Sequence, residues 1–401
     1  MNATATMLLD AATTPRRHDL DWLRVIALAL LIFYHVGMVY VTWDFHIKSA
    51  HAGPLIEPAM LAVNPWRLML LFFISGVALR FALARVALRQ FLLRRTLRLF
   101  VPIVFGMVVV VMPQAYVELL WKGEIEPDFA TFYLSYLSPR QEFSIITPTW
   151  NHLWYVVYIM VYTLAVAAML PALRRLDGPS QRLFSWLAAS PWGLLTLPAL
   201  PFLAYRLLLD PIFPTTHTLI DDWATHAHAL TIFVFGYLCA RSAAFWHGVD
   251  RTLGRALALA ATLGFVLLWL RLNATTSDRM LLEAVPGLRV FYAWAVIMAL
   301  LGLAQRHLDK PGRALDYLNQ AIFPCYILHQ TLIIVIGYAL LACALPAWVE
   351  AALVTFGTVA GCVVLYEIVR RIALVRPLFG LPYRSASGQR RATVWLPVPR
   401  G

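Results

Sequence analysis

An arginine and a histidine stand eleven residues apart in the apolar stretch LDWLRVIALALLIFYH, at Arg24 and His35. At about 100° per helical residue, this separation is three turns plus about 20°, so both side chains share one face of a helix. Asp21, three residues before Arg24, joins that face as a candidate site-lining residue. If Arg24 lies at a membrane boundary, His35 lies about 16 Å deeper, near mid-membrane. An ionisable group at that depth is costly unless it faces a polar cavity, so the pair predicts a functional site.

The same pair also has a purely structural interpretation. Arg24 can extend its guanidinium group to lipid headgroups, and His35 can hydrogen-bond a neighbouring helix. The balance shifts towards function when other apolar stretches carry polar residues as well, because each of them needs a polar environment.

Five further side chains interrupt or border other apolar stretches and are candidates for lining the same site. They are Ser75, Arg80, His152, Trp154 and His329. Trp154 is expected in the aromatic belt at a membrane interface, and its flat ring also suits stacking on a sugar. A buried histidine such as His329 needs a polar partner and is as strong a candidate as His35.

The densest basic cluster in the chain contains Arg94, Arg95 and Arg98. Arg95 and Arg98 are three residues apart on one helical face, shortly before Pro102. Guanidinium groups at this spacing suit the phosphates of a nucleotide-like ligand that approaches from the cytoplasm. A basic run beside a membrane is also a common topology determinant or contact for anionic lipids, and the two interpretations carry equal weight.

The segment DDWATHAH raises the question of a metal site. Asp222 and His226 are four residues apart, and His228 is close by. On a helix His228 points away from the other two, so the face lacks a third ligand and we expect no metal. The sequence also has no P-loop, GxGxxG turn, G-x-S-x-G elbow or HExxH helix, which leaves no motif of a soluble enzyme.

Composition indicates the elements that must position these residues. With 61% hydrophobic and 13% charged residues among 401, the chain is too apolar for a soluble domain of this size. We count ten apolar segments, each long enough to cross the roughly 30 Å hydrocarbon layer, and the short sixth segment and the prolines at the third and fifth leave eight to eleven spans possible. They are 22–42, 66–86, 99–119, 150–170, 190–209, 226–242, 253–272, 286–305, 318–343 and 346–369. The predicted fold class is an all-α integral membrane protein, a bundle of about ten transmembrane helices.

Arginines and lysines concentrate in the tails and alternate loops, whereas most acidic residues lie in the other loops. By the positive-inside rule both termini are cytoplasmic. The net charge of +12 then reflects the orientation of the chain in the membrane. The expected partner is the lipid bilayer, and no nucleic acid is expected. The first span lacks a cleavage site and should remain as an anchor. We expect a cytoplasmic tail at 1–18, a membrane domain at 19–372 and a basic cytoplasmic tail at 373–401.

Five short motifs in this order resemble the membrane acyltransferase-3 family. They are Arg24-x₁₀-His35, FFISG at 72–76, RRTLRLFVP at 94–102, HLWYV at 152–156 and YILHQ at 326–330. The resemblance runs from about residue 18 to 372. The stretch HVGMVYVTWDFHIKSA after the first span is most similar to the branch with the succinyltransferase of periplasmic glucans. Val77, where many members have Phe or Tyr, departs from the family pattern.

The resemblance implies an O-acyltransferase of the bacterial cytoplasmic (inner) membrane. It would move an acetyl or succinyl group from cytoplasmic acyl-CoA, a co-substrate, to a hydroxyl of an extracytoplasmic or periplasmic glycan, with no bound cofactor. His35 and Arg24 carry over as catalytic, and Arg95 and Arg98, with Arg94, as donor-binding. A neutral imidazole can take the hydroxyl proton as the oxygen attacks the thioester, and a guanidinium can stabilise developing charge. Direct transfer and an acyl-histidine intermediate both stay open.

Two other classes of function fit buried charges in a helix bundle. A secondary transporter has them too, but it predicts paired broken helices in two related halves, and we find no such pairing. A non-catalytic flippase or export subunit of an envelope-glycan pathway is the second alternative. Thioester cleavage that depends on His35 separates an enzyme from both. The sequence leaves open the choice between acetyl and succinyl, the acceptor glycan and the oligomeric state.

Overall fold

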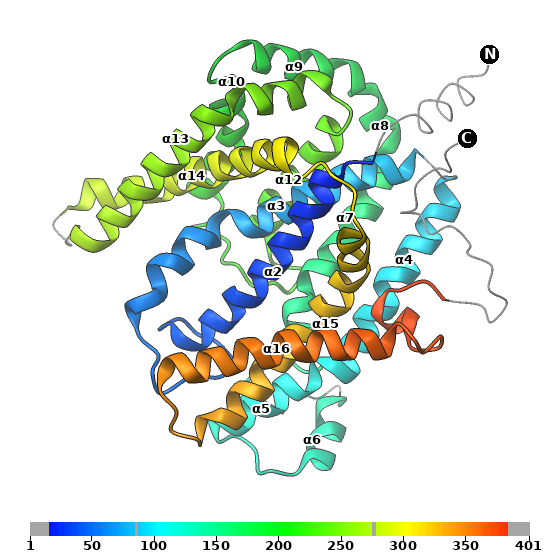
Figure 1. Cartoon of the computed structure of the whole chain (residues 1–401), viewed down its shortest axis with the longest axis vertical. Coiled ribbons are helices and arrows are strands. Elements are labelled where there is room, and N and C mark those ends of the chain that lie inside the picture. The colour runs from blue at the N-terminus through cyan, green and yellow to red at the C-terminus, as the bar shows by residue number, and fades with distance from the viewer. Residues whose placement is uncertain (1–15, 85–86, 139, 141, 275–277, 384–401) are drawn as a thin grey trace.

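The computed structural model describes residues 16–84, 87–138, 140, 142–274 and 278–383, and all regular secondary structure in these ranges is helical (Figure 1). The longer helices are α2 (His18–Tyr40), α3 (Glu57–Leu83), α4 (Leu88–Phe105), α5 (Met112–Lys122), α7 (Trp154–Ala168), α9 (Asp177–Ala189), α12 (Trp223–Cys239), α13 (Ala243–Asn273), α14 (Arg279–His307), α15 (Arg313–Leu341) and α16 (Ala347–Val369). The shorter α-helices are α6 (Phe129–Tyr136), α8 (Leu170–Arg175), α10 (Gly193–Thr196) and α11 (Leu200–Leu208). The 3-10 turns are η1 (Pro54–Ile56), η3 (Asn151–Leu153), η4 (Leu197–Ala199) and η5 (Arg376–Phe379), and η2 (Gly106–Val110) is a π-helical turn.

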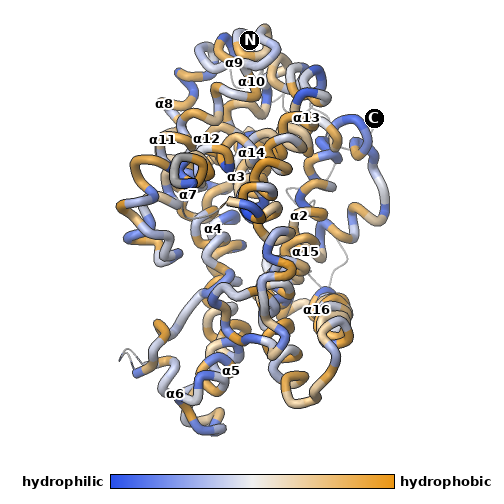
Figure 2. Tube along the Cα trace, turned by 90° about the vertical axis from the view of Figure 1, so that its left-hand side faces the viewer, coloured by the Kyte–Doolittle hydropathy of each residue, from blue (hydrophilic) through white to orange (hydrophobic). Residues whose placement is uncertain are grey.

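Eight helical segments of the described ranges are long and apolar enough to cross a membrane. They are His18–Tyr40, Pro54–Leu83, Leu88–Lys122, Asn151–Ala168, Ala243–Asn273, Leu281–His307, Arg313–Leu341 and Ala347–Val369. The fold is therefore an all-helical membrane bundle. Figure 2 shows apolar residues along these helices, α16 among them, and hydrophilic residues towards the connecting segments.

Two of the ten predicted spans differ from this set. The fifth, 190–209, is the second arm of a bent pair, Asp177–Ala189 and Gly193–Leu208, whose axes turn by 112°. Pro191 lies in the break, where a residue without an N–H cannot continue a helix. The sixth, 226–242, corresponds to α12, which has 17 residues and is short for a span. Length and composition thus give eight spans in the described chain, or nine with the bent pair counted as one.

The surface of α16 has the pattern of a lipid-facing helix. The side chain of Phe356 is 74% exposed, whereas Thr358 and Glu350 on the same helix are buried. Apolar groups outside and polar groups inside are expected where the surrounding medium is hydrocarbon.

The first and last described segments lie at the same end of the bundle. Arg16, just before α2, pairs with Asp316 at the start of α15 at 3.0 Å. Arg98 of α4 donates through Nε to the carbonyl oxygen of Gly380, just after η5, at 2.8 Å. We call this the arginine end, and the other end of the bundle is where α2 and α15 finish.

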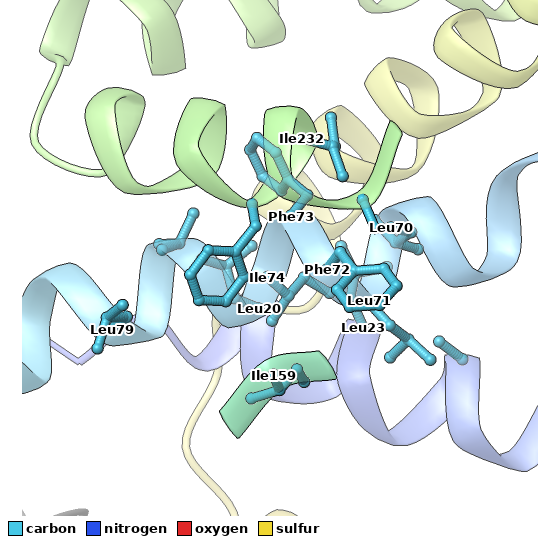
Figure 3. Close-up of a cluster of buried hydrophobic side chains, with 14 of the residues drawn as sticks. Leu20, Leu23, Leu70, Leu71, Phe72, Phe73, Ile74, Leu79, Ile159 and Ile232 are labelled. Carbon is cyan, nitrogen blue, oxygen red and sulfur yellow. The ribbon is translucent and has the colours of Figure 1, made fainter. Parts of the chain in front are cut away.

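Helices α2, α3, α7 and α12 share one cluster of buried apolar side chains (Figure 3). The cluster includes Leu20 and Leu23 of α2 and Leu71 of α3. Phe73 of α3 and Ile232 of α12 belong to it as well. Between helices in a bilayer, association depends on close packing more than on exclusion of water.

Two glycines let α3 and α12 approach closely. A Cβ atom on Gly76 would overlap the backbone carbonyl of Phe233, and one on Gly236 would overlap the carbonyl of Phe73. Small residues on facing helices permit such backbone contact in membranes. The glycine of the FFISG motif therefore has a packing role.

Candidate active site

A cavity of about 790 Å³ opens among the helix ends opposite the arginine end. Its wall combines α2, α3, α5, α7 and α15 with the turns η2 and η3 and with three connecting segments, those before η3 and α12 and the one after α2. The wall includes His35, His46, Arg67, Glu118, Trp150, Asn151, His152, Trp154, Tyr155, His217, Tyr326 and Gln330. Cavities of this size hold ligands with several rings.

His35 is paired with His329 from a distant part of the chain. Nδ1 of His35 lies 2.8 Å from Nε2 of His329, and the two rings are nearly parallel at a centroid distance of 5.0 Å. His35 is part of the cavity wall, whereas His329 lies behind it and is 1% exposed. The sequence singled out both histidines but not their contact.

Hydrogen bonds assign the tautomers of this pair. Nδ1 of His329 lies 2.7 Å from the carbonyl oxygen of Tyr326, which only accepts, so Nδ1 carries the hydrogen. Nε2 of the neutral His329 ring is then an acceptor, and Nδ1 of His35 donates to it. The lone pair of His35 resides on Nε2, which makes no hydrogen bond to any residue that the structure describes. The pair therefore presents His35 as a base.

His152 joins α15 to the turn η3. Its Nε2 donates to the carbonyl oxygens of Tyr326 and Ile327, each at 3.1 Å, and the hydroxyl of Tyr326 donates to the His152 carbonyl. The ring of His152 lies edge-on to His329 at a centroid distance of 5.1 Å. His152 thus holds α15, and with it His329, against the cavity.

Arg24 faces the same neighbour as His35. Nη2 of Arg24 donates to Oδ1 of Asn319 at 2.5 Å, and Asn319 lies on α15, the helix that carries His329. Arg24 also lies 3.5 Å from Oδ1 of Asp21, which pairs more closely with Arg16. The structure thus confirms that Arg24 and His35 share a face of α2, the one turned to α15. Only His35 is part of the cavity wall.

The arginines of α4 point in different directions. Arg95 and Arg98 turn inwards, close enough to Arg24 for the three positive charges to repel one another, whereas Arg94 is exposed. Nε of Arg95 is buried and has no hydrogen-bond partner among the described residues. Three guanidinium groups gathered in this way form a candidate anion site.

Tyr155 connects this arginine cluster to the cavity. It belongs to the cavity wall, and its hydroxyl lies 3.1 Å from Oγ of Ser75. Its phenol is also within electrostatic range of Arg24 and Arg95. The polar residues at the two ends of the bundle are thus linked through Tyr155.

The last two candidates, Trp154 and Arg80, differ in their surroundings. Trp154 stacks on His217 in the cavity wall at a ring distance of 4.0 Å. Arg80 instead pairs with Asp177 of α9 at 2.8 Å and donates to the hydroxyl of Tyr237. It is not among the cavity residues.

Three polar residues that the sequence analysis did not single out also belong to the wall. Nδ1 of His46 lies 2.5 Å from Oε2 of Glu118, whose other oxygen accepts from Lys122 at 2.7 Å. Nε2 of Gln330 lies 2.9 Å from Nε2 of His46. Nothing in the sequence relates Glu118 to His46, because 72 positions separate the two residues.

The DDWATHAH segment organises a loop. Asp222 accepts hydrogen bonds from the hydroxyl of Tyr158 at 2.6 Å and from the backbone N–H groups of Thr216 and His217, both at 3.1 Å. Burial acts against ionisation of Asp222, but these donors outweigh it and hold its pKa below the usual value. In the part of the chain that the structure describes, no group of three or more His, Cys, Asp or Glu residues could hold a metal ion.

A membrane bundle whose polar cavity holds a paired histidine, with a cluster of arginines at its other end, has features of a membrane-embedded enzyme. Residues 17–367 match the model of the Acyl_transf_3 family, described as an acyltransferase domain. The chain therefore belongs to this family and is an integral membrane O-acyltransferase.

Two curated relatives are named glucans biosynthesis protein C. The one from Salmonella gallinarum is 21% identical over 384 residues, which cover 92% of this chain and 96% of the relative. The one from Salmonella heidelberg is 20% identical over 382 residues, with the same coverage. No solved structure matches this chain significantly.

Proposed function

We propose that the protein transfers an acetyl or succinyl group from cytoplasmic acyl-CoA to a hydroxyl of an extracytoplasmic glycan. It would act in the cytoplasmic (inner) membrane, with the arginine end towards the cytoplasm. The observation that carries the proposal is the pair of His35 and His329, because it leaves a lone pair on Nε2 of a histidine in the cavity wall. The name of the relatives favours a glucan as the acceptor.

The cavity suits the acceptor. Its mouth is formed by segments at the end opposite the arginines, which is the side from which an external glycan arrives. Trp150 and Trp154 offer apolar rings, and Glu118 and Asn151 offer oxygen atoms for sugar hydroxyls. Such a mixture of flat apolar surfaces and a few polar groups is typical of a ligand site.

The arginine cluster suits the donor. CoA carries phosphates, and Arg95 and Arg98 hold guanidinium groups on the inner side of α4. Arg24 lies between them and the cavity end of α2, where it can bind the pantetheine region or stabilise charge that develops on the thioester oxygen. The thioester would then reach His35 past Tyr155.

The chemical step is an acyl exchange in which His35 moves one proton. Nε2 of His35 takes the proton of the sugar hydroxyl as its oxygen attacks the thioester carbonyl carbon. The C–O bond forms, the C–S bond breaks, and the CoA thiolate takes the proton back from the imidazolium. His329 accepts a hydrogen bond from Nδ1 of His35 throughout, which fixes the orientation of the ring. In the acyl-histidine variant, Nε2 itself attacks first.

Mass spectrometry of envelope glycans tests this proposal. Cells that carry the protein should show glycans with acetyl or succinyl mass increments, and His35→Ala should abolish them while the protein remains inserted. His247→Ala, at an exposed histidine of α13, is the matched control and should leave the increments unchanged. Undiminished acylation in the His35 variant would refute the assignment.

A further inference from the structure

Arg67 is a buried cation in the cavity wall. It lies on α3, is 8% exposed, and belongs to the same cavity as His35. Nη1 of Arg67 donates to the backbone carbonyl of Asn64 at 3.2 Å and also to the amide oxygen of that residue. The guanidinium carbon lies 3.5 Å from the centre of the Tyr34 ring. All of these partners are neutral.

Among the described residues, no carboxylate compensates the charge of Arg67. Arg67 forms no ion pair with any described residue, and its Nε has no hydrogen-bond partner among them. Glu118, the one carboxylate in the described part of the cavity wall, is already shared by His46 and Lys122. Arg80 on the same helix, by contrast, has Asp177 as its partner. A buried charge without a counter-ion is costly, so an anionic ligand is the natural complement of Arg67.

The charge of Arg67 also acts within the cavity. Burial lowers the pKa of His217 in the facing loop, and the positive charge of Arg67 adds to that effect while Asp222 opposes it. His217 is itself part of the cavity wall. A ligand in this space therefore meets the field of Arg67.

Arg67 lies close to the reacting histidine. Its guanidinium group covers Tyr34, and the ring of Tyr34 lies 6.1 Å from the ring of His35. One aromatic side chain thus separates the cation from the base. A ligand carboxylate bound by Arg67 would therefore lie in the same cavity as a carbonyl group presented to His35.

We propose that Arg67 binds a carboxylate of the substrate and so determines which substrate the cavity accepts. The inference rests on the proposed acyl transfer and deepens it. The carboxylate is either the free end of a dicarboxylic acyl group such as succinyl, or an acidic substituent on the acceptor glycan. In both cases the planar guanidinium group pairs with a carboxylate through parallel hydrogen bonds.

The test uses the purified full chain in lipid nanodiscs. Rates are measured with succinyl-CoA or acetyl-CoA on a neutral glucan, and with acetyl-CoA on a carboxylated glucan. If the acyl group carries the carboxylate, Arg67→Gln lowers kcat/KM for succinyl-CoA by at least about 10-fold and changes acetyl transfer by less than about twofold. If the glycan carries it, the loss is confined to the carboxylated glucan. Arg67→Lys should recover part of the activity.

Arg271→Gln is the matched control. Arg271 of α13 pairs with Glu57, which lies on α3 like Arg67, and neither Arg271 nor Glu57 lines the cavity. Arg271→Gln should therefore change none of the measured rates. An equal loss for all substrates in Arg67→Gln, or no loss for any, overturns the proposal, because either result makes Arg67 a structural residue.

A binding measurement distinguishes a failure of this inference from a failure of the proposed acyl transfer. If the wild-type protein acylates no glucan, thermal stabilisation by succinyl-CoA, acetyl-CoA and the two glucans still tests Arg67, because stabilisation depends on binding alone. The proposal then requires that the carboxylated ligand stabilise the wild-type protein more than the counterpart that lacks the carboxylate, and that Arg67→Gln remove this difference. An unchanged difference would refute it.

Discussion

Nδ1 of His35 on α2 and Nε2 of His329 on α15 lie 2.8 Å apart, although 294 positions separate the two residues in sequence. His329 is in turn fixed by the carbonyl oxygen of Tyr326 in its own helix. In the proposed mechanism the two membrane histidines have different roles: His35 exchanges a proton in the cavity, and His329 orients His35.

Removing the acceptor behind His35 should slow the chemistry. We expect His329→Leu to lower kcat by about 100-fold, since His35 loses the partner that fixes its tautomer, while KM for acyl-CoA stays nearly constant. Steady-state rates measure both quantities. His329→Gln, whose amide oxygen can accept a hydrogen bond, should recover part of the rate. A kcat like that of the wild type in His329→Leu would show that His35 needs no such support.

The bond between Arg24 and Asn319 should matter for the donor. Asn319→Leu leaves Arg24 without its partner on α15, so we expect KM for acyl-CoA to rise by about 10-fold with little change in kcat. A titration of initial rate against donor concentration measures this. A lower kcat at unchanged KM would instead place Arg24 in the chemical step alone.

The contact between α3 and α12 should tolerate no side chain at Gly76. A methyl group there meets the backbone carbonyl of Phe233, which cannot move without the helix, so Gly76→Ala should cost about 1–3 kcal/mol in the free energy of unfolding. Thermal unfolding in detergent should show a lower Tm. Gly254→Ala is the control, because its Cβ would meet nothing within 4 Å. Equal Tm values for the two variants would disprove the close contact.

The loop that carries His217 should weaken in acid. Burial is the main reason that the pKa of His217 lies below its ordinary value of 6.5, so the folded protein favours the neutral ring and the unfolded chain binds more protons. The resulting stability loss begins as the pH falls below about 6.5. His217→Asn should reduce the decrease in Tm between pH 7 and pH 5, and an identical decrease in both proteins would contradict this.

Helical periodicity and apolar length predicted much of the fold. The eleven-residue spacing of Arg24 and His35 predicts a shared face, and the structure turns that face towards α15. Apolar length predicted most of the spans. The prolines of the fifth segment left the number of spans open, because a proline in an apolar run permits both a kinked span and a reversal, and the structure has a bend at Pro191.

The contacts between side chains of different helices could not be predicted from the sequence. His329 was a candidate because it interrupts an apolar helix, but periodicity within one helix cannot identify its partner on another. Arg67 was missed because a cation near the end of a span is usually a residue that reaches the headgroups. Only its burial in the cavity wall shows that it does not.

The most direct test of the account places the two substrates on opposite sides of a membrane. Proteoliposomes hold glucan inside and receive acyl-CoA outside, with the arginine end outwards, and the acylated glucan and released CoA thiol are quantified. We predict equal amounts of both for the wild-type protein and at least about a 100-fold lower rate of both for His35→Ala. Acylation of the enclosed glucan at the wild-type rate by His35→Ala would contradict the central claim that this histidine carries the proton.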